Sequence, residues 1–320
     1  MDKQILVYAD LAGTPYRVGR LWTHARARRE SATFEYDASW LDQPLRFALE
    51  PALHLGPGPF HTGADGRMFG AIGDSAPDRW GRALMRRRER RLATTEGRTP
   101  RTLTETDYLL QVDDEARLGA LRFRESVDGP FLREAVEGRI PPLVDVGRLL
   151  AAADRVADDR DTIDDLKLLL APGSSLGGAR PKASVRDRDG ALAIAKFPHR
   201  DDDWDAVRWE WTALTLARRA GLDVAEARIE AIGERAVLIV KRFDRVGAHR
   251  VPYLSAMSLL GAQDHETRSY LELADALRQH GAEPDADCRA LWRRMVFTVL
   301  VSNTDDHLRN HGLLLAGPTG

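Results

Sequence analysis

Residues 173–196 read GSSLGGARPKASVRDRDGALAIAK, and this stretch carries the clearest signal of the fold. A cluster of small residues comes first, and two strand-like segments follow on either side of a polar turn at 188–190. The second segment, ALAIAK, is almost continuously apolar, which is typical of a strand that is buried on both faces. The stretch therefore predicts a loop that leads into a β-hairpin, with Lys196 at the end of the inner strand.

Downstream of the hairpin the pattern first becomes helical. Val207, Trp211, Leu214 and Ala217 are spaced like one face of a helix that ends near Gly221. RIEAIG (228–233) and AVLIVKRF (236–243) then predict a second strand pair, and helices are expected around 271–279 and 288–301. The order from residue 173 onward is loop, strand, strand, helix, strand, strand and then helices.

Upstream of the hairpin, short strand-like segments at 5–8, 16–22 and 32–36 predict a small antiparallel unit. A passage rich in Gly and Pro, LGPGPFHTGADG (55–66), interrupts the pattern. Asp74, Ser75 and Pro77 supply a helix start before the basic run RWGRALMRRRERR (79–91). Apolar residues are interleaved with the arginines, so we expect a half-buried helix with a solvated face. Contact with DNA or an acidic partner is the less favoured alternative.

Composition places the chain among ordinary soluble proteins. Its 320 residues are 43% hydrophobic and 30% charged, with a formal net charge of -2, so no bulk charge favours nucleic acid or a membrane as the partner. A single cysteine excludes an internal disulfide framework. The N-terminal residues MDKQILVYAD lack the pattern of a secretory signal, and we expect a cytoplasmic protein.

Several residues match the needs of phosphoryl transfer, which takes a backbone cradle, a cation on the phosphates, an acid that positions the hydroxyl, and oxygen ligands for magnesium. The Gly/Ser cluster at 173–179 lets backbone N–H groups approach phosphate oxygens. Lys196 is placed to reach those phosphates, and Glu210 on the next helix is placed to pair with Lys196. The alternatives are a plain loop, a lysine that extends to water, and a solvent-facing glutamate.

The most specific motif is NTDDHLRN (303–310), which follows a helix whose apolar side looks buried. That side carries Leu291, Met295, Val299 and Leu300. Asp305 and Asn310 have the separation found in the kinase catalytic loop, where the aspartate takes the hydroxyl proton and the asparagine holds a metal. A rival interpretation makes Asp305, His307 and His311 a transition-metal site.

Six motifs in order give the chain a family resemblance. They are VYADLAGTPYRVGRLW, DSAPDRWGRALM, SSLGGARPK, LAIAKF, VLIVKRFDR and NTDDHLRNHG. Together they resemble the HipA family of serine/threonine kinases, the toxins of bacterial toxin–antitoxin modules. The resemblance implies an α+β, protein-kinase-like fold of two lobes with an extra N-terminal β-rich subdomain and an incomplete C-terminal helical lobe. It also implies ATP and Mg²⁺ as cofactors, an aminoacyl-tRNA synthetase or similar translation protein as substrate, and a helix-turn-helix antitoxin through which the complex meets operator DNA.

The resemblance also assigns residues. Ser175 matches the autophosphorylated serine, Lys196 the ATP-binding lysine, Asp305 the catalytic aspartate and Asn310 the magnesium asparagine. Lys241 and Phe243 fall at the hinge that receives adenine, although some relatives carry an acidic residue where this chain has Lys241. The set of cofactor-binding residues is completed by Gly177, Gly178, Ala179, Lys182, Glu210 and His307.

By this resemblance residues 1–165 form the N-terminal region, 166–246 the ATP-binding lobe, and 247–320 the start of the helical catalytic lobe. Kinases place a second metal-binding aspartate on strands after the catalytic loop, and only residues 311–320 follow Asn310 here. We therefore expect weak phosphoryl transfer, and a catalytically inactive module that binds nucleotide or antitoxin is the alternative. A kinase of small molecules is a third possibility, but it would not need the N-terminal unit.

Overall fold

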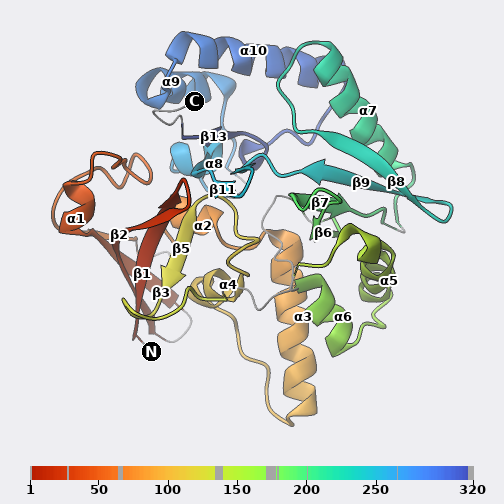
Figure 1. Cartoon of the computed structure of the whole chain (residues 1–320), viewed down its shortest axis with the longest axis horizontal. Helices are drawn as coiled ribbons and strands as arrows, with labels where there is room; N and C mark the ends of the chain where they lie inside the picture. Colours follow the sequence, from red (N-terminus) through yellow and green to blue (C-terminus); the bar gives the residue numbers. More distant parts are fainter. Residues whose placement is uncertain are drawn as a thin grey trace.

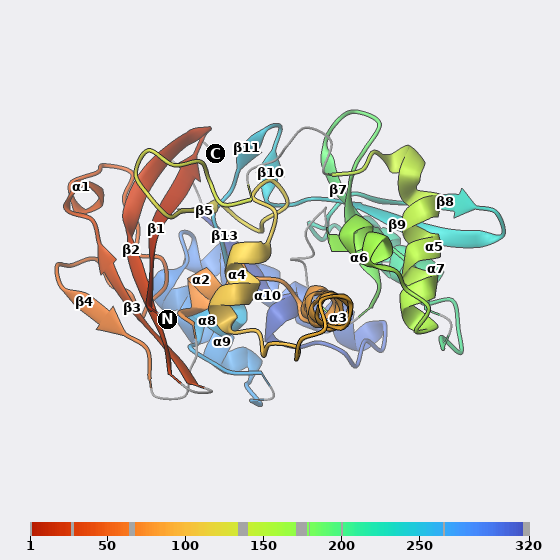
Figure 2. The same cartoon turned by 90° about the horizontal axis from the view of Figure 1, so that it is seen from below.

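The computed structural model describes residues 2–26, 29–63, 68–133, 140–170, 178, 180–199, 201–264 and 266–315. Figure 1 shows an N-terminal sheet, a four-stranded sheet with its own helices, and a mainly helical part formed by the later residues. The long helix α3 (Arg79–Thr95) lies between the two sheets, and the view from below in Figure 2 shows it end-on in that position.

The N-terminal sheet has five antiparallel strands in the order β4-β3-β2-β1-β5. The strands are β1 (Asp2–Leu11), β2 (Thr14–Arg26), β3 (Arg29–Tyr36), β4 (Pro59–His61) and β5 (Leu121–Arg124). Gly13 has φ +86° in the turn between β1 and β2, a conformation that glycine adopts without strain. The three strands predicted from the sequence are therefore confirmed, and β5 joins them from a distant part of the chain.

Several helices lie along the chain between β3 and the second sheet. They are α1 (Ala38–Leu41), α2 (Gly70–Asp74), α3, α4 (Glu105–Gln111), the 3-10 turn η1 (Leu143–Asp145), α5 (Val146–Ala157) and α6 (Ile163–Leu170). The predicted start of α3 was wrong in detail. Asp74 belongs to α2, and the residue that caps α3 is Asp78, whose carboxylate accepts a hydrogen bond of 2.8 Å from the Gly81 N–H.

Three arginines of α3, namely Arg82, Arg87 and Arg91, are paired with carboxylates of the same chain. Arg82 bonds Glu105 at 2.6 Å, and Arg87 bonds the buried Asp161 at 2.6 Å. Leu84 and Met85 on the other face are buried. This arrangement agrees with the predicted half-buried helix and leaves these arginines without the free charge that contact with DNA phosphates would use.

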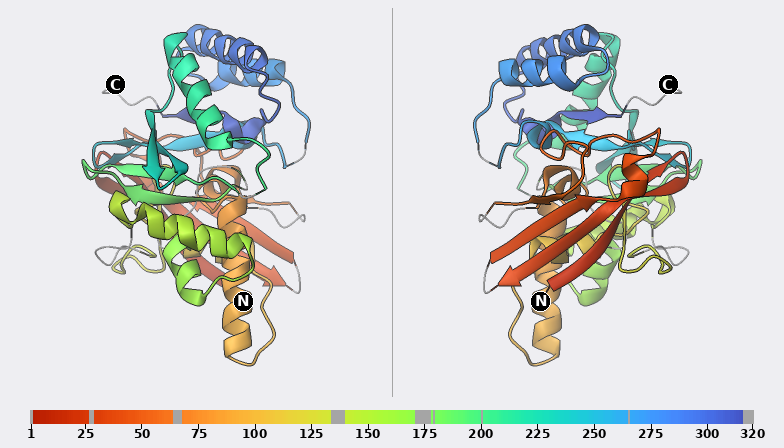
Figure 3. Two further views of the ribbon diagram at one scale, coloured as in Figure 1. Left: turned by 90° about the vertical axis from the view of Figure 1, so that its right-hand side faces the viewer. Right: turned by 90° about the vertical axis from the view of Figure 1, so that its left-hand side faces the viewer.

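The second sheet has the order β6-β7-β9-β8 and is covered on both faces. Its strands are β6 (Lys182–Arg186), β7 (Leu192–Lys196), β8 (Ala227–Ile232) and β9 (Arg235–Lys241). On one face Val237 and Ile239 pack with α3, α5 and α6, while Ala236 and Leu238 on the other face pack against α7 (Ala206–Arg219). Figure 3 shows α7 and α5 on opposite sides of the strands. Two covered faces explain why the sequence of β9 is continuously apolar.

The later residues form short strands and two longer helices. The elements are β10 (Arg245–Val246), β11 (His249–Arg250), β12 (Tyr253–Ser255), α8 (Ala256–Leu259), α9 (Tyr270–His280), α10 (Pro284–Leu300), η2 (Leu308–Asn310) and β13 (Gly312–Leu314). Leu291 of α10 is buried against Leu273 and Leu277 of α9. The expectation of a buried side was wrong for Val299 and Leu300, which are 72% and 77% exposed. Apolar spacing marks the face of a helix, but it does not supply a neighbour that covers that face.

Two buried carboxyl groups lie at α2, and one of them joins this helix to the later residues. Glu50 accepts a hydrogen bond of 2.5 Å from the Ala71 N–H of α2. Asp74 at the end of α2 accepts from the Ser255 N–H at 2.7 Å and from the Ser255 hydroxyl at 2.8 Å. Burial, and the proximity of Asp74, raise the pKa of Glu50 to about 7, and burial raises the pKa of Asp74 as well.

Glu50→Gln is expected to stabilise the protein at pH 8. The folded state keeps Glu50 protonated up to about pH 7, whereas the unfolded chain releases the proton near 4.5, so stability falls as the pH rises through this window. Gln keeps an oxygen for the Ala71 N–H but carries no charge. Urea unfolding should show a gain on the order of 3 kcal/mol at pH 8 that shrinks towards pH 4.5. Equal pH dependence in the two proteins would contradict the assignment.

Candidate nucleotide-binding and catalytic site

Lys196 and Glu210 form an ion pair between β7 and α7. The helix begins after Asp205, whose carboxylate accepts a hydrogen bond of 2.9 Å from the Arg208 N–H. Val207 of the first turn is buried against the sheet, and Glu210 lies one turn further along the same face. The ion pair expected from the sequence is therefore present, and its partners are 31% and 38% exposed.

Lys182 lies directly opposite Lys196 in the register of β6 and β7. Directly opposed residues of an antiparallel pair point to the same face of the sheet. The Lys182 ammonium donates to Asp78 Oδ2 at 2.7 Å and to the Gly178 carbonyl at 3.1 Å. Burial lowers the pKa of Lys182, the nearby charge of Lys196 adds to this effect, and Asp78 opposes it.

The start of β6 is held by the first turn of α3. The Trp80 N–H donates to the Gly178 carbonyl at 3.3 Å, and the Trp80 indole donates to the Lys182 carbonyl at 3.0 Å. Sequence reasoning missed both Asp78 and Trp80, although the aspartate before a helical run carried the signal of an N-cap. Ser175, Gly177 and Ala179 lie outside the described residues.

From Lys241, the last residue of β9, the side chains alternate between solvent and interior. Lys241 is half exposed, 3.8 Å from the carboxylate of Glu226. The Phe243 ring is 43% exposed and lies 5.5 Å from the Tyr253 ring, measured between centroids. Arg242 between them is buried. The segment expected to form the hinge thus presents Lys241 and Phe243 outward.

Arg242 and Asp244 anchor this segment to the N-terminal region. Asp244 accepts from the Arg242 Nε at 2.6 Å, the Arg245 Nη1 at 2.6 Å and the Gly119 N–H at 2.7 Å. The Arg242 Nη1 donates to the Ala116 carbonyl at 2.8 Å. Although burial alone would raise the pKa of Asp244, the two arginines lower it. Two cations therefore share one fully buried carboxylate.

In the loop after α10, Asp305 and Asn310 are joined by a hydrogen bond. The Asn310 side-chain amide donates to the Asp305 carbonyl at 2.5 Å, and Asn303 Oδ1 accepts from the Asp305 N–H at 3.1 Å. These bonds hold the backbone of Asp305 and leave its carboxylate 91% exposed. The exposed carboxylate is accessible to a hydroxyl group that approaches from solvent.

The neighbouring Asp306 has a structural environment. Its carboxylate is 12% exposed, accepts a hydrogen bond from the Tyr270 hydroxyl, and lies 3.0 Å from His311 Nε2. Burial alone would raise the pKa of Asp306, but the bonds from His311 and Tyr270 lower it. Arg309 bonds Asp264 at 2.9 Å and holds the loop from another side. Two adjacent aspartates therefore divide into one that supports the loop and one that faces solvent.

The rival transition-metal site is not assembled. His307 Nε2 is 3.9 Å from Asp305 Oδ1, while His311 is engaged with Asp306. In the part of the chain that the structure describes, no three His, Cys, Asp or Glu side chains are grouped as metal ligands. Asp305 and Asn310 do offer the carboxylate and amide oxygens that Mg²⁺ prefers, and Mg²⁺ commonly takes its other ligands from substrate phosphates and water.

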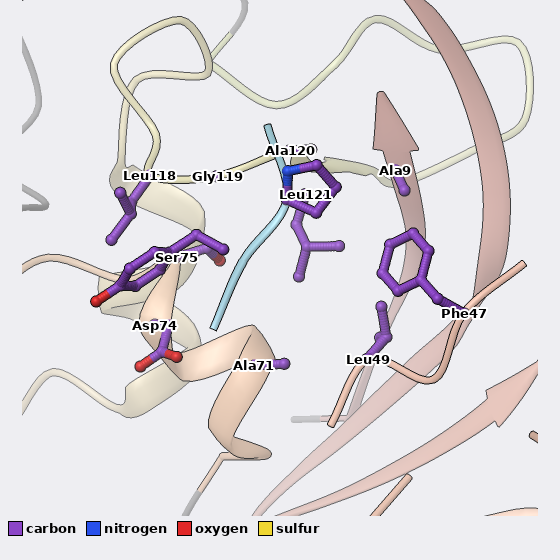
Figure 4. A pocket seen from close by; sticks show the side chains of 12 residues that line it. Ala9, Phe47, Leu49, Ala71, Asp74, Ser75, Leu118, Gly119, Ala120 and Leu121 are labelled. Carbon is purple, nitrogen blue, oxygen red and sulfur yellow. The ribbon is translucent and has the colours of Figure 1, made fainter. Parts of the chain in front are cut away.

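Figure 4 shows a small pocket whose lining includes Gly119. It lies between the N-terminal sheet, α2 and the segment before β12, and Asp74 and Ser75 are on its wall. None of the candidate site residues lines it.

Among the described residues, no helix has both the length and the apolarity needed to span a membrane.

Two family models match the chain. The HipA N-terminal domain matches residues 12–105, and the HipA-like C-terminal domain matches residues 174–320. Among curated proteins, the candidate kinase Y4mE of Sinorhizobium fredii is 28% identical over 167 residues. That alignment covers 44% of this chain and 38% of Y4mE, so the chain spans well under half the length of this relative.

Solved structures give a longer match. A chain in the complex of HipA, HipB and operator DNA from the toxin–antitoxin system of Shewanella oneidensis MR-1 has a TM-score of 0.63 and 18% identity. The match covers 99% of this chain and 73% of that chain. The proinflammatory kinase CtkA of Helicobacter pylori gives a TM-score of 0.38 at 25% identity, over 44% of this chain and 50% of that chain. The likeness to the Shewanella chain confirms the expected α+β fold with an N-terminal β-rich unit.

Proposed function

This chain belongs to the HipA-like family, and on that premise we propose that it is a serine/threonine protein kinase that transfers the γ-phosphate of ATP to a protein hydroxyl. The observation that carries the proposal is the Lys196–Glu210 ion pair between β7 and α7. Protein kinases use such a pair to hold a lysine on the nucleotide phosphates. The family indicates phosphoryl transfer as the class of reaction. The ion pair indicates Lys196 as the cation that binds the phosphates.

The remaining roles follow the family resemblance and, for the described residues, the surroundings of each side chain. Lys196 and Lys182 are adjacent cations for the phosphates, with Gly177, Gly178 and Ala179 as the backbone cradle. The exposed Phe243 ring, together with Lys241, receives the adenine, and His307 completes the set that binds the cofactor. Asp305 accepts the proton of the attacking hydroxyl, because its carboxylate is exposed while that of Asp306 is engaged in the loop.

Mg²⁺ is proposed as the second cofactor, with Asn310 as a protein ligand. When bound, the ion neutralises charge on the phosphates. The side chain of Asn310 is already held close to Asp305, so one short loop would carry both the ligand and the acid that positions the hydroxyl. Ser175 is proposed as the site of autophosphorylation, and a phosphate there would repel the phosphates of ATP and close the site.

The partners are proposals as well. The Shewanella structure holds HipA with HipB and operator DNA, and we propose a HipB-like helix-turn-helix antitoxin for this chain, with DNA contacted through it. The proposed substrate is an aminoacyl-tRNA synthetase.

The domain boundaries at 165/166 and 246/247 and the cytoplasmic location remain predictions. One core cluster contains α3, α5 and α6 together with β6, β7 and β9, so residues on both sides of the first boundary pack together.

Lys196→Met is expected to weaken ATP binding by roughly 10- to 100-fold, because a charge-assisted hydrogen bond contributes about 1.5–3 kcal/mol. Calorimetry with a non-hydrolysable ATP analogue and Mg²⁺ measures the change. Lys167→Met is the matched control, since Lys167 is an exposed lysine paired with Asp164 on α6. If the unsubstituted chain binds no nucleotide, or if both variants bind as well as it does, the proposal fails.

A further inference from the structure

Asp78 is a buried aspartate from the N-terminal region, and it contacts the proposed ATP-binding lobe (residues 166–246), called the nucleotide lobe below. One carboxylate oxygen caps α3 through the Gly81 N–H, and the other accepts from the Lys182 ammonium at 2.7 Å. The side chains of Lys182 and Asp78 are only 4% and 5% exposed. An ion pair this deeply buried persists when both partners are fixed, and loss of one partner leaves the other as an uncompensated charge.

The two lysines at the end of the hairpin each have their own carboxylate. Lys196 is paired with Glu210 of α7, and Lys182 is paired with Asp78 of α3. Because Lys182 and Lys196 are directly opposite in the register, their charges repel each other. Neither ammonium is stable in that place without its carboxylate. The four side chains come from β6, β7, α7 and the start of α3. Of these elements, α3 alone belongs to the N-terminal region of the chain.

We infer that Asp78 is a positioning residue of the nucleotide site, whose carboxylate keeps the Lys182 ammonium charged as a second phosphate-binding cation beside Lys196. The inference rests on the proposed function, since it needs a nucleotide at this sheet. It assigns part of the ATP site to the N-terminal region of the chain. Trp80 supports the same role, because its indole and its N–H fix the Lys182 and Gly178 carbonyls.

The charge of Asp78 can be removed without removing the helix cap. Asparagine is as good an N-cap as aspartate, so Asp78→Asn keeps the bond to the Gly81 N–H and loses the compensation of Lys182. The Lys182 ammonium then faces Lys196, with Glu210 as the remaining nearby carboxylate. Lys182 would release its proton more readily. The phosphates of ATP would then contact the charge of Lys196 but not that of Lys182.

Nucleotide binding tests the inference through its dependence on pH. Asp78→Asn should bind the ATP analogue about 10-fold more weakly than the unsubstituted chain at pH 8.5, with the ratio approaching one at pH 6.5 as Lys182 regains its proton. Lys182→Met and the double variant should show a deficit that does not depend on pH relative to the unsubstituted chain. In the presence of Lys182→Met, the Asp78→Asn change should have no further effect on affinity.

Asp37→Asn is the control, because Asp37 caps α1 through the Ser39 N–H and forms an ion pair with Arg17 at 2.5 Å, away from the nucleotide lobe. It should leave affinity unchanged at every pH. If Asp78→Asn lowers only the melting temperature, or if its deficit does not depend on pH, the inference is wrong and Asp78 is a structural residue. If the unsubstituted chain binds no ATP, the proposed function itself fails. Failure of the inference is a different result, because the unsubstituted chain then still binds ATP.

Discussion

Asp305→Asn is expected to reduce phosphoryl transfer to a protein hydroxyl by about 10²- to 10⁴-fold, the usual contribution of a positioned acid or base. Asparagine has the same shape but cannot accept the proton of the hydroxyl. The loop should keep its structure, because the bonds to Asn303 and Asn310 use the backbone of Asp305 and not its carboxylate. Binding of ATP should therefore be nearly unchanged while transfer is lost.

Transfer is measured by the phosphate that appears on Ser175 and on a protein acceptor, read by mass spectrometry. Asp275→Asn is the matched control, since Asp275 is an exposed aspartate paired with Arg278 on α9. Transfer that is equally fast in Asp305→Asn would exclude Asp305 as the catalytic base. Binding of ATP by the unsubstituted chain without any transfer would favour the alternative of a module that binds nucleotide or antitoxin.

Asp244→Ala should cause the largest loss of stability, on the order of 3–5 kcal/mol. The change leaves the buried guanidinium groups of Arg242 and Arg245 without their shared carboxylate and leaves the Gly119 N–H without its acceptor. Domains are stable by only about 5–15 kcal/mol in total, so a loss of this size threatens folding. The same contacts join the segment after β9 to residues 116–119, and we expect ATP binding to fall together with stability.

Urea unfolding and thermal melting measure this prediction. Asp275→Ala breaks an exposed ion pair and should cost less than about 1 kcal/mol. If Asp244→Ala were as mild as that control, the buried network would not be a source of stability. Should the variant fail to fold, Asp244→Asn offers a weaker test, because it keeps an acceptor for the Gly119 N–H and loses only the charge.

The local pattern of the sequence predicted most elements of the nucleotide lobe. The hairpin 182–196, the helix that carries Glu210 and the second strand pair all follow from apolar spacing and turn residues, which act over a few neighbours. Lys196 and Glu210 could be paired in advance, since a strand and the next helix lie close along the chain. The predicted start of α3 failed because several capping residues precede that helix and only the backbone geometry selects Asp78.

The amino-acid pattern alone was enough for the order of strands and helices from the hairpin to β9, the basic half-buried helix and the resemblance to a family. The packing of distant segments was needed to learn which of two adjacent aspartates is exposed, that Val299 and Leu300 are uncovered, and that Asp78 reaches a lysine 104 positions away. Local structure depends on residues a few positions apart, whereas burial and charge compensation depend on which distant segments meet. The pairs Asp78–Lys182 and Asp244–Gly119 join such segments, and in them a side chain's charge is set by partners that no local pattern of residues specifies.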